Sequence, residues 1–154
     1  MQSYLYYCDA AVDNLYRGSG VAVVVRLAAA SQAQPASRII ATASRFLGGM
    51  TNNEAEYEAF ILGLQFAIQR RDRMPIVLSD SQIVIGQVAG CFAVRDRKLQ
   101  PRHTRARRLL AQLPEATVVF VPRERNLIAD ALAKETLAEG LAGLESSGGQ
   151  EAGE

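Results

Sequence analysis

Residues 51–57 read Thr-Asn-Asn-Glu-Ala-Glu-Tyr, and at this point the periodicity of the apolar residues changes. From Thr51 to about Arg71, apolar residues recur at the spacing of a helix. Thr51 and Glu54 also have the spacing of a capping box, in which each side chain bonds the backbone of the other residue. The stretch therefore predicts a helix and divides the chain into two halves of different character.

The half before this helix contains three predicted strands. Residues 3–8 are rich in aromatic side chains, residues 21–25 form a nearly continuous apolar run, and residues 39–47 alternate between apolar and polar. Because the connections between these strands are short, we expect consecutive antiparallel pairs.

The half after this helix alternates predicted strands and helices. Residues 75–79 and 117–121 have the pattern of short buried strands, and residues 81–88, 102–113 and 126–138 have the pattern of helices. The complete order predicts an α/β fold. Its five-stranded mixed sheet has three antiparallel strands followed by βα units, with helices on both faces.

The composition is that of one globular domain with an acidic tail. The chain has 154 residues, of which 49% are hydrophobic and 21% charged, and this excludes a disordered or collagen-like chain. We assign residues 1–138 to the domain. Residues 139–154 contain Gly, Ser and Glu but no Lys or Arg, which predicts a flexible tail that is a natural end or a linker to a further domain.

The location of the protein is expected to be cytoplasmic. No apolar run approaches the ~20 residues of a membrane span, and the N-terminus lacks a signal-peptide pattern. Cys8 and Cys91 lack the spacing of a zinc site and are too few for a disulfide framework.

Four carboxylates are the candidate catalytic residues. Asp9 and Asp80 end predicted strands, whereas Glu56 and Asp130 lie in the first turns of predicted helices. Side chains just beyond the ends of parallel strands face the crevice in which ligands bind. Each acid alone also fits a structural role, as a turn residue, a helix cap or an i,i+4 partner such as Lys134 for Asp130. Together they suit hard divalent cations, two of which can activate water and stabilise the leaving oxygen of a phosphodiester.

Four motifs in this order resemble the ribonuclease H type 1 family, over residues 3–138. They are Tyr7-Cys8-Asp9-Ala10, Thr51-Asn52-Asn53-Glu54-Ala55-Glu56-Tyr57, Leu78-Ser79-Asp80-Ser81-Gln82, and Pro-Arg-Glu-Arg-Asn-Leu-Ile-Ala-Asp-Ala-Leu-Ala at 122–133. The resemblance implies a ribonuclease H-like fold. The Pro-Arg-Glu stretch is similar to the shorter bacterial and archaeal form of the family.

The resemblance also implies an activity. It predicts a monomeric endoribonuclease that hydrolyses the RNA strand of RNA/DNA hybrids and leaves 5′-phosphate and 3′-hydroxyl ends. The cofactor would be Mg²⁺, with Mn²⁺ as a substitute, two ions per site with substrate bound. All four acids would be catalytic and metal-binding. Asp9 would bridge both ions, Glu56 and Asp80 would lie on the leaving-group side, and Asp130 would hold the ion that activates water.

Further residues match substrate-binding positions of the family. Asn52, Asn53 and Gln82 match positions that read the minor groove of the hybrid, and Thr51 matches one that binds a DNA phosphate at a helix N-terminus. The two asparagines also suit helix capping. Glu124 lies on the loop where many members carry a histidine, and it is either a loop assistant or a solvated surface acid.

A basic segment spans residues 95–108, which contain seven Lys or Arg and one acid, Asp96. Such a run is either a solvated face or a patch that binds phosphates. From it we select Arg105, Arg107 and Arg108 as substrate-binding candidates.

Two other functions share part of this pattern. A DNA nuclease or resolvase of the same fold would use the acids but not the Thr-Asn-Asn and Asp-Ser-Gln elements. A non-catalytic hybrid-binding module would need neither metal nor four acids.

Overall fold

The computed structural model describes residues 3–28 and 38–152, with side chains up to residue 147. At its centre is a five-stranded sheet with the strand order β3-β2-β1-β4-β5. The strands are β1 (Tyr4–Val12), β2 (Ser19–Leu27), β3 (Arg38–Leu47), β4 (Ile76–Ser79) and β5 (Thr117–Phe120). β1, β2 and β3 pair in antiparallel fashion, while β4 is parallel to β1 and to β5. The predicted mixed sheet is therefore confirmed.

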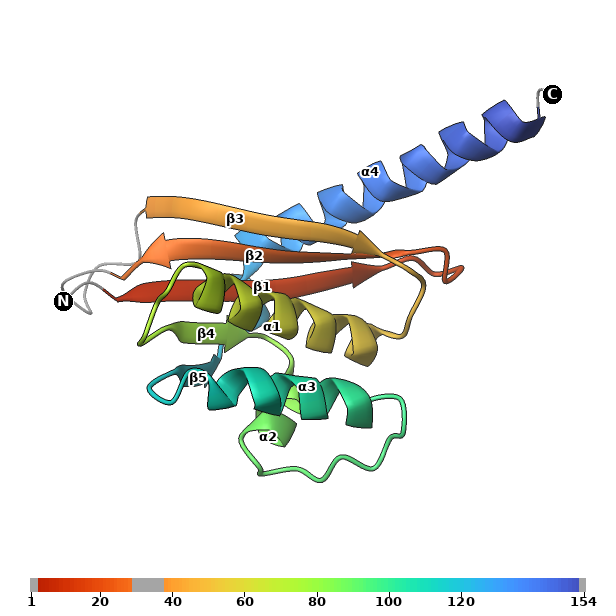
Figure 1. Cartoon of the computed structure of the whole chain (residues 1–154). Helices are drawn as coiled ribbons and strands as arrows, with labels where there is room; N and C mark the ends of the chain where they lie inside the picture. Colours follow the sequence, from red (N-terminus) through yellow and green to blue (C-terminus); the bar gives the residue numbers. More distant parts are fainter. Residues whose placement is uncertain (1–2, 29–37, 153–154) are drawn as a thin grey trace.

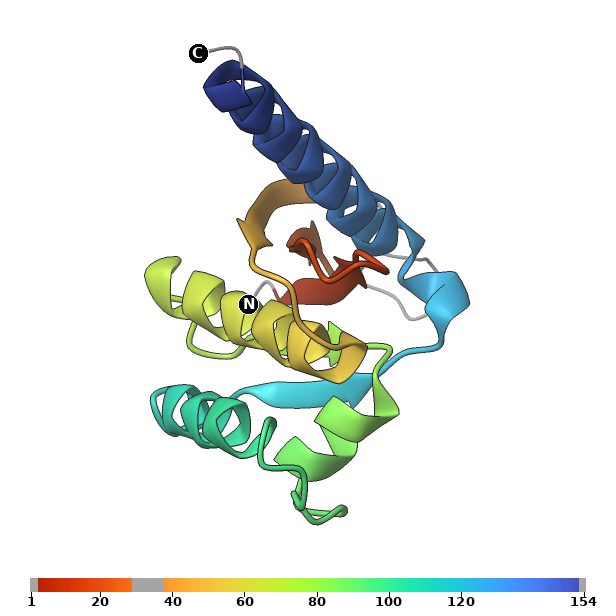
Figure 2. The same ribbon diagram turned by 90° about the vertical axis from the view of Figure 1, so that its right-hand side faces the viewer.

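Helices cover both faces of this sheet (Figures 1 and 2). The helices are α1 (Asn52–Gln69), α2 (Gln82–Val88), α3 (Gln100–Ala111) and α4 (Leu127–Ala152), with a short 3-10 helix, η1 (Arg123–Arg125), before α4. α1 packs on β1 and β2 from one side, and α4 packs on the same strands from the other side. α2 packs on β4 and β5, and α3 packs on α1 and α2. Within the described residues, no helix is long and apolar enough to cross a membrane.

The core lies between the sheet and these helices. Residues 21–25 of β2 are buried along their whole length, because α1 covers one face of the strand and α4 the other. On the α1 side, the core includes Tyr6, Phe60, Leu64 and Val77, each fully buried. The continuous apolar run in the sequence is thus explained by a strand that has no solvent-facing side.

Two glycines allow α1 and α4 to approach the sheet closely. A Cβ added at Gly63 of α1 would lie 2.5 Å from Sγ of Cys8 on β1. A Cβ added at Gly20 of β2 would lie 2.2 Å from the carbonyl oxygen of Ala133 in α4. Both distances are far below van der Waals contact, so any larger residue would require the helix to move.

β1 is longer than the sequence predicted. Residues 3–8 were expected, but the strand continues to Val12 because it forms a hairpin with β2, in which Asp9 pairs with Ala22. The parallel pairing with β4 ends earlier, at Cys8 and Ser79. The prediction that Asp9 ends its strand is therefore wrong. Asp9 lies within β1, at the first position beyond the pairing with the shorter strand β4.

α4 also extends further than predicted, ending at Ala152 instead of about residue 138. Gly140 does not stop the helix. A Cβ added there would lie 2.0 Å from Cδ1 of Phe46 on β3, which shows how closely the helix packs at this point. Such tertiary contact offsets the cost of about 1 kcal/mol that glycine imposes on a helix. The role of residues 139–154 as an end or a linker stays a prediction.

The other elements agree with the sequence to within two residues at each end. α3 begins at Gln100 and ends at Ala111, two residues earlier at each end than predicted. Pro101 lies in its first turn, where a proline ring is favoured because the missing N–H has no helical partner.

Candidate active site

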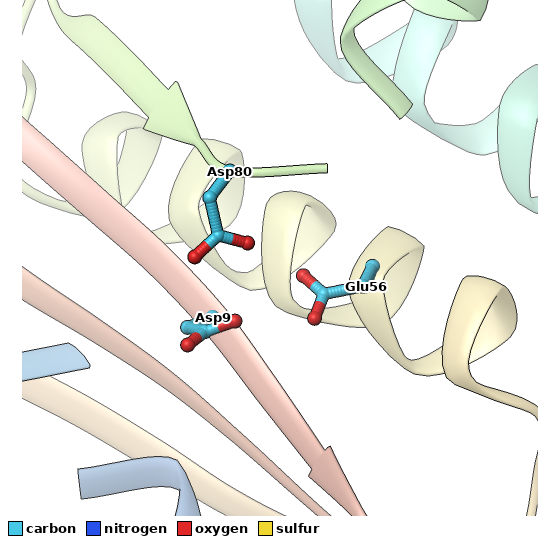
Figure 3. Close-up of side chains that lie close together, drawn as sticks. All are labelled: Asp9, Glu56 and Asp80. Carbon is cyan, nitrogen blue, oxygen red and sulfur yellow. The ribbon is translucent and has the colours of Figure 1, made fainter. Parts of the chain in front are cut away.

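Three of the four predicted acids meet at the carboxyl end of the β1–β4 pairing (Figure 3). Asp9 comes from β1, Asp80 directly follows β4, and Glu56 comes from α1. One carboxylate oxygen of each residue lies within 4.8 Å of one oxygen of each of the others. Glu56 is in the second turn of α1 rather than the first, and this places its side chain over the sheet edge.

Burial and the charges of neighbouring acids change the ionisation of Asp9 and Glu56. The Asp9 side chain is buried, and burial followed by the charge of Asp80 raises the pKa of Asp9 to about 7. Burial, and next the charge of Asp9, likewise raises the pKa of Glu56. Among the described residues, no Lys, Arg or His forms an ion pair with any of the three carboxylates. The charge of the cluster is therefore not compensated by a basic side chain of the described residues.

The donor set fits a hard divalent cation. Carboxylate oxygens are the ligands that Mg²⁺ prefers, and three of them converge here. Cys8 is adjacent in sequence to Asp9, but its Sγ is buried on the core side and donates to the carbonyl oxygen of Tyr6 at 3.7 Å. Burial raises the pKa of this thiol well above its usual range, so the thiolate that a soft metal requires is not available.

Asp130 lies near this cluster but outside the group of three. It is in the first turn of α4, and its Oδ2 is 2.9 Å from Nζ of Lys134, one turn further on. The i,i+4 ion pair named as the structural alternative is thus present. The charge of Asp130 makes a smaller contribution to the raised pKa of Asp9, after burial and Asp80. Its metal-binding role stays a prediction.

Asn126 is a residue whose contact with the site the sequence did not predict. It precedes α4 and is 1% exposed. Its Nδ2 donates to the carbonyl oxygen of Cys8 at 2.8 Å and to Oδ2 of Asp80 at 3.1 Å. Its Oδ1 has no hydrogen-bond partner among the described residues, so the side chain does not cap α4. Asn126 joins the ends of β1 and β4 to the start of α4, and so fixes the orientation of Asp80.

The predicted substrate-reading residues lie at two helix N-termini beside the acids. Thr51 is the N-cap of α1 and forms the predicted capping box with Glu54, which is confirmed. Asn52 and Asn53 begin α1 with exposed side chains, and Gln82 begins α2, also exposed. Their amide groups are therefore accessible to a ligand at this end of the sheet.

Thr51, Asn52 and Asn53 also line a hollow of about 350 Å³ with the β1–β2 hairpin. At the tip of this hairpin, Tyr16 is exposed and has a positive φ of 56°. The exposed turn at the start of α1 is therefore flanked by a polar depression.

The basic segment is only partly free to bind phosphates. Arg105 Nη1 lies 3.9 Å from Oε2 of Glu58, and Arg107 Nη1 donates to the carbonyl oxygen of Val88 at 3.0 Å. Arg108 is exposed and has no ion pair or hydrogen bond among the described residues. Their role in substrate binding stays a prediction.

Two other sequence candidates have simple surroundings. Glu124 is exposed in η1, which leads into α4, and its role as a loop assistant stays a prediction. His103 of α3 has its Nε2 3.2 Å from the carbonyl oxygen of Gln87 on α2.

Comparison with known proteins identifies the family. The model of the reverse transcriptase-like family matches residues 7–136. Ribonuclease HI of Halobacterium salinarum is 37% identical over 99 residues, which are 64% of this chain and 50% of that protein. The bifunctional protein Rv2228c of Mycobacterium tuberculosis is 34% identical over 101 residues, which are 66% of this chain. The matched region spans only 28% of the mycobacterial protein.

Solved structures agree with this assignment. The N-terminal RNase H domain of Rv2228c has a TM-score of 0.79 at 26% identity and covers 94% of this chain and 99% of that one. RNase H1 of Halobacterium salinarum has a TM-score of 0.77 at 31% identity, and the match covers 89% of this chain and 98% of that one. LC11-RNase H1, in complex with an RNA/DNA hybrid, has a TM-score of 0.76 at 24% identity and covers 90% and 99%. The chain belongs to the reverse transcriptase-like family and, within it, to the ribonuclease H type 1 domains.

Proposed function

We propose that this protein is an endoribonuclease that hydrolyses the RNA strand of RNA/DNA hybrids with the help of two divalent metal ions. The observation that carries the proposal is the convergence of Asp9, Glu56 and Asp80, with no basic partner in the part of the chain that the structure describes, in a domain of the ribonuclease H type 1 family. The products would be a 5′-phosphate and a 3′-hydroxyl end.

The acids would hold the ions. Asp9, Glu56 and Asp80 offer converging oxygens, and Asp130 is the candidate for a fourth ligand from α4. Bound divalent ions would supply a lowered pKa for the attacking water and charge stabilisation for the leaving oxygen. Asn126 would keep Asp80 in place through its 3.1 Å hydrogen bond, so that the carboxylate needs little rearrangement during the reaction.

Substrate recognition would fall to the exposed helix N-termini. The backbone N–H groups and positive dipole end of α1 favour a phosphate near Thr51. Asn52, Asn53 and Gln82 offer amide groups to base edges and to 2′-hydroxyls, which are the groups that distinguish RNA from DNA. The complex of LC11-RNase H1 with a hybrid supports this substrate class for the present chain.

A substrate panel tests the proposal. Matched RNA/DNA, RNA/RNA and DNA/DNA duplexes, labelled on each strand in turn, would be incubated with Mg²⁺, Mn²⁺ or EDTA. We expect cleavage of the RNA strand of the hybrid alone, with either ion and not with EDTA. Cleavage of DNA/DNA would favour a DNA nuclease, and hybrid binding without cleavage would favour a non-catalytic module.

The remaining expectations of the sequence have no test in the structure. A cytoplasmic monomer that acts on a hybrid, with Mg²⁺ as its ion and Mn²⁺ as a substitute, stays part of the proposal. Size-exclusion chromatography with light scattering would measure the oligomeric state, and activity against ion concentration would measure the preference for a metal.

A further inference from the structure

Glu54 places a negative charge next to the turn that we propose as a phosphate contact. Its Oε1 accepts hydrogen bonds from Thr51 N at 3.2 Å and from Thr51 Oγ1 at 3.0 Å, and its own N–H donates to Thr51 Oγ1 at 3.3 Å. The capping box thus stabilises the turn, but its carboxylate would repel an incoming phosphate.

Arg102 of α3 lies against this carboxylate. Its Nη1 is 2.7 Å from Oε2 of Glu54, and its Nε is 3.0 Å from Oε1 of Glu58, one turn further along α1. The same Nη1 also donates to the carbonyl oxygen of Lys98 at 3.2 Å. The side chain of Arg102 is 24% exposed, that of Glu54 14% and that of Glu58 18%, so water screens these charges less than it would those of a fully exposed pair.

Glu54 is ionised at neutral pH in this setting. A free Glu has a pKa of about 4.3, and a guanidinium at 2.7 Å favours the charged form of the carboxyl still further. Removal of Arg102 would therefore leave a full negative charge beside Thr51.

We propose that Arg102 is a positioning residue that neutralises Glu54 and thereby allows the N-terminal turn of α1 to accept a phosphate of the nucleic acid. The inference rests on the proposed function. It differs from the expectation for Arg105, Arg107 and Arg108, because those side chains would contact phosphate directly, whereas Arg102 acts through Glu54.

The first measurement is the effect of Arg102→Gln on hybrid cleavage and on hybrid binding in EDTA. We expect KM and Kd to rise about fivefold to tenfold, with kcat within about twofold of the unmutated value, because the acids that carry the chemistry are untouched. Arg102→Lys retains the charge and should keep KM within about twofold. Arg45→Gln, an exposed position on β3, removes the same charge elsewhere and serves as the control.

The decisive measurement is rescue by Glu54→Gln. Glutamine keeps an acceptor for the capping box but removes the charge. If Arg102 acts by neutralisation, Glu54→Gln alone leaves KM unchanged or lower, and the double variant with Arg102→Gln regains most of the lost affinity. If the ion pair only braces α1 against α3, Glu54→Gln raises KM as Arg102→Gln does, and the double variant is no better. That second result would overturn the inference.

The outcomes separate this inference from the proposed function. An unmutated protein that neither binds nor cleaves the hybrid overturns both. An unmutated protein that cleaves the hybrid, with Arg102→Gln indistinguishable from Arg45→Gln, overturns the inference alone. Thermal melts report whether each variant folds. If Arg102→Gln does not fold, Glu54→Gln decides by itself, because weaker binding in this folded variant contradicts neutralisation and unchanged or tighter binding supports it.

Discussion

Glu54 and Glu56 are two residues apart on α1, yet they lie in opposite electrostatic surroundings. Glu54, like Glu58, faces α3 and pairs with Arg102, and its pKa is lowered. Glu56 faces Asp9 and Asp80, has no basic partner among the described residues, and has a raised pKa. We call Glu54 and Glu58 the compensated acids, and Asp9, Glu56 and Asp80 the uncompensated acids. One helix thus separates carboxylates whose cation is built into the fold from carboxylates whose cation would come from solution.

Removal of a carboxylate charge should strongly lower activity only among the uncompensated acids. Asp80→Asn keeps the shape of the side chain but removes the charge that a divalent ion requires, so we expect kcat/KM on the hybrid to fall by about a thousandfold or more. Glu58→Gln should stay within about threefold. Steady-state cleavage with Mg²⁺ measures both, and Mg²⁺-dependent turnover by Asp80→Asn at the unmutated rate would show that the site assignment is wrong.

Stability should respond with opposite signs on the two sides. In EDTA, Asp9→Asn should melt at a higher temperature than the unmutated protein, because it removes repulsion within the cluster. Glu58→Gln should lose about 0–1 kcal/mol of unfolding free energy, as expected for a partly exposed ion pair.

Mg²⁺ should reverse the order of the melting temperatures of Asp9→Asn and the unmutated protein. Mg²⁺ at a hundredfold excess over its Kd adds about 2.7 kcal/mol to the unmutated protein and should add less to Asp9→Asn. Thermal melts with and without EDTA provide both comparisons. A lower melting temperature for Asp9→Asn in EDTA, with the same response to Mg²⁺, would mean that the acids do not form one site.

The unfolding free energy of the metal-free protein should also depend on pH because of the uncompensated acids. The folded pKa of Asp9, about 7, is above the value of about 3.9 for an unfolded Asp. Between these values the native state binds more protons than the unfolded state, so the unfolding free energy contributed by Asp9 declines as the pH rises.

Glu54 behaves in the opposite way. Its pKa is lowered in the folded state, so it contributes stability above its unfolded pKa and loses it as the pH falls.

Melts of the unmutated protein and Asp9→Asn in EDTA, from about pH 5 to about pH 8, would measure how much of the pH dependence comes from Asp9. The decline should be smaller in Asp9→Asn, and equal slopes would contradict the assignment.

The smallest effects are expected from substitutions of the basic residues of α3. These residues also differ in whether the fold already provides a partner for the side chain. Arg107 already donates to a backbone carbonyl, whereas Arg108 has no partner among the described residues. Arg108→Ala should therefore reduce the log–log slope of hybrid binding against salt by about 0.9, the value for one phosphate contact, and Arg107→Ala should reduce it by less. An unchanged slope for Arg108→Ala would make this part of α3 a solvated face.

The local features of this molecule could be predicted from the sequence. The capping box at Thr51 and the buried run in β2 each depend on neighbouring residues, and both are present. Four acids were expected together, because the motifs placed them at strand ends and helix starts, and three of them, Asp9, Glu56 and Asp80, do meet.

Contacts between distant segments could not be predicted. Nothing local indicates that Arg102 meets Glu54 from 48 positions away, or that Asn126 reaches Cys8 from 118 positions away. The length of α4 was underestimated for a similar reason, because its support comes from β3 rather than from its own sequence.

The contact of Gly63 with Cys8 connects the apolar core to the choice of ion. Gly63 lies about two turns after Glu56 on the same face of α1, and Cys8 is the neighbour of Asp9. A methyl group at Gly63 would push α1 away from β1, and we expect this to increase the distance between the Glu56 oxygens and those of Asp9. Because Mg²⁺ demands shorter oxygen distances than larger divalent ions, we expect Gly63→Ala to shift activation from Mg²⁺ toward Mn²⁺, which the ratio of the two activities measures. Selection of an ion by its radius would then depend partly on the hydrophobic interior, through a residue that never touches the metal.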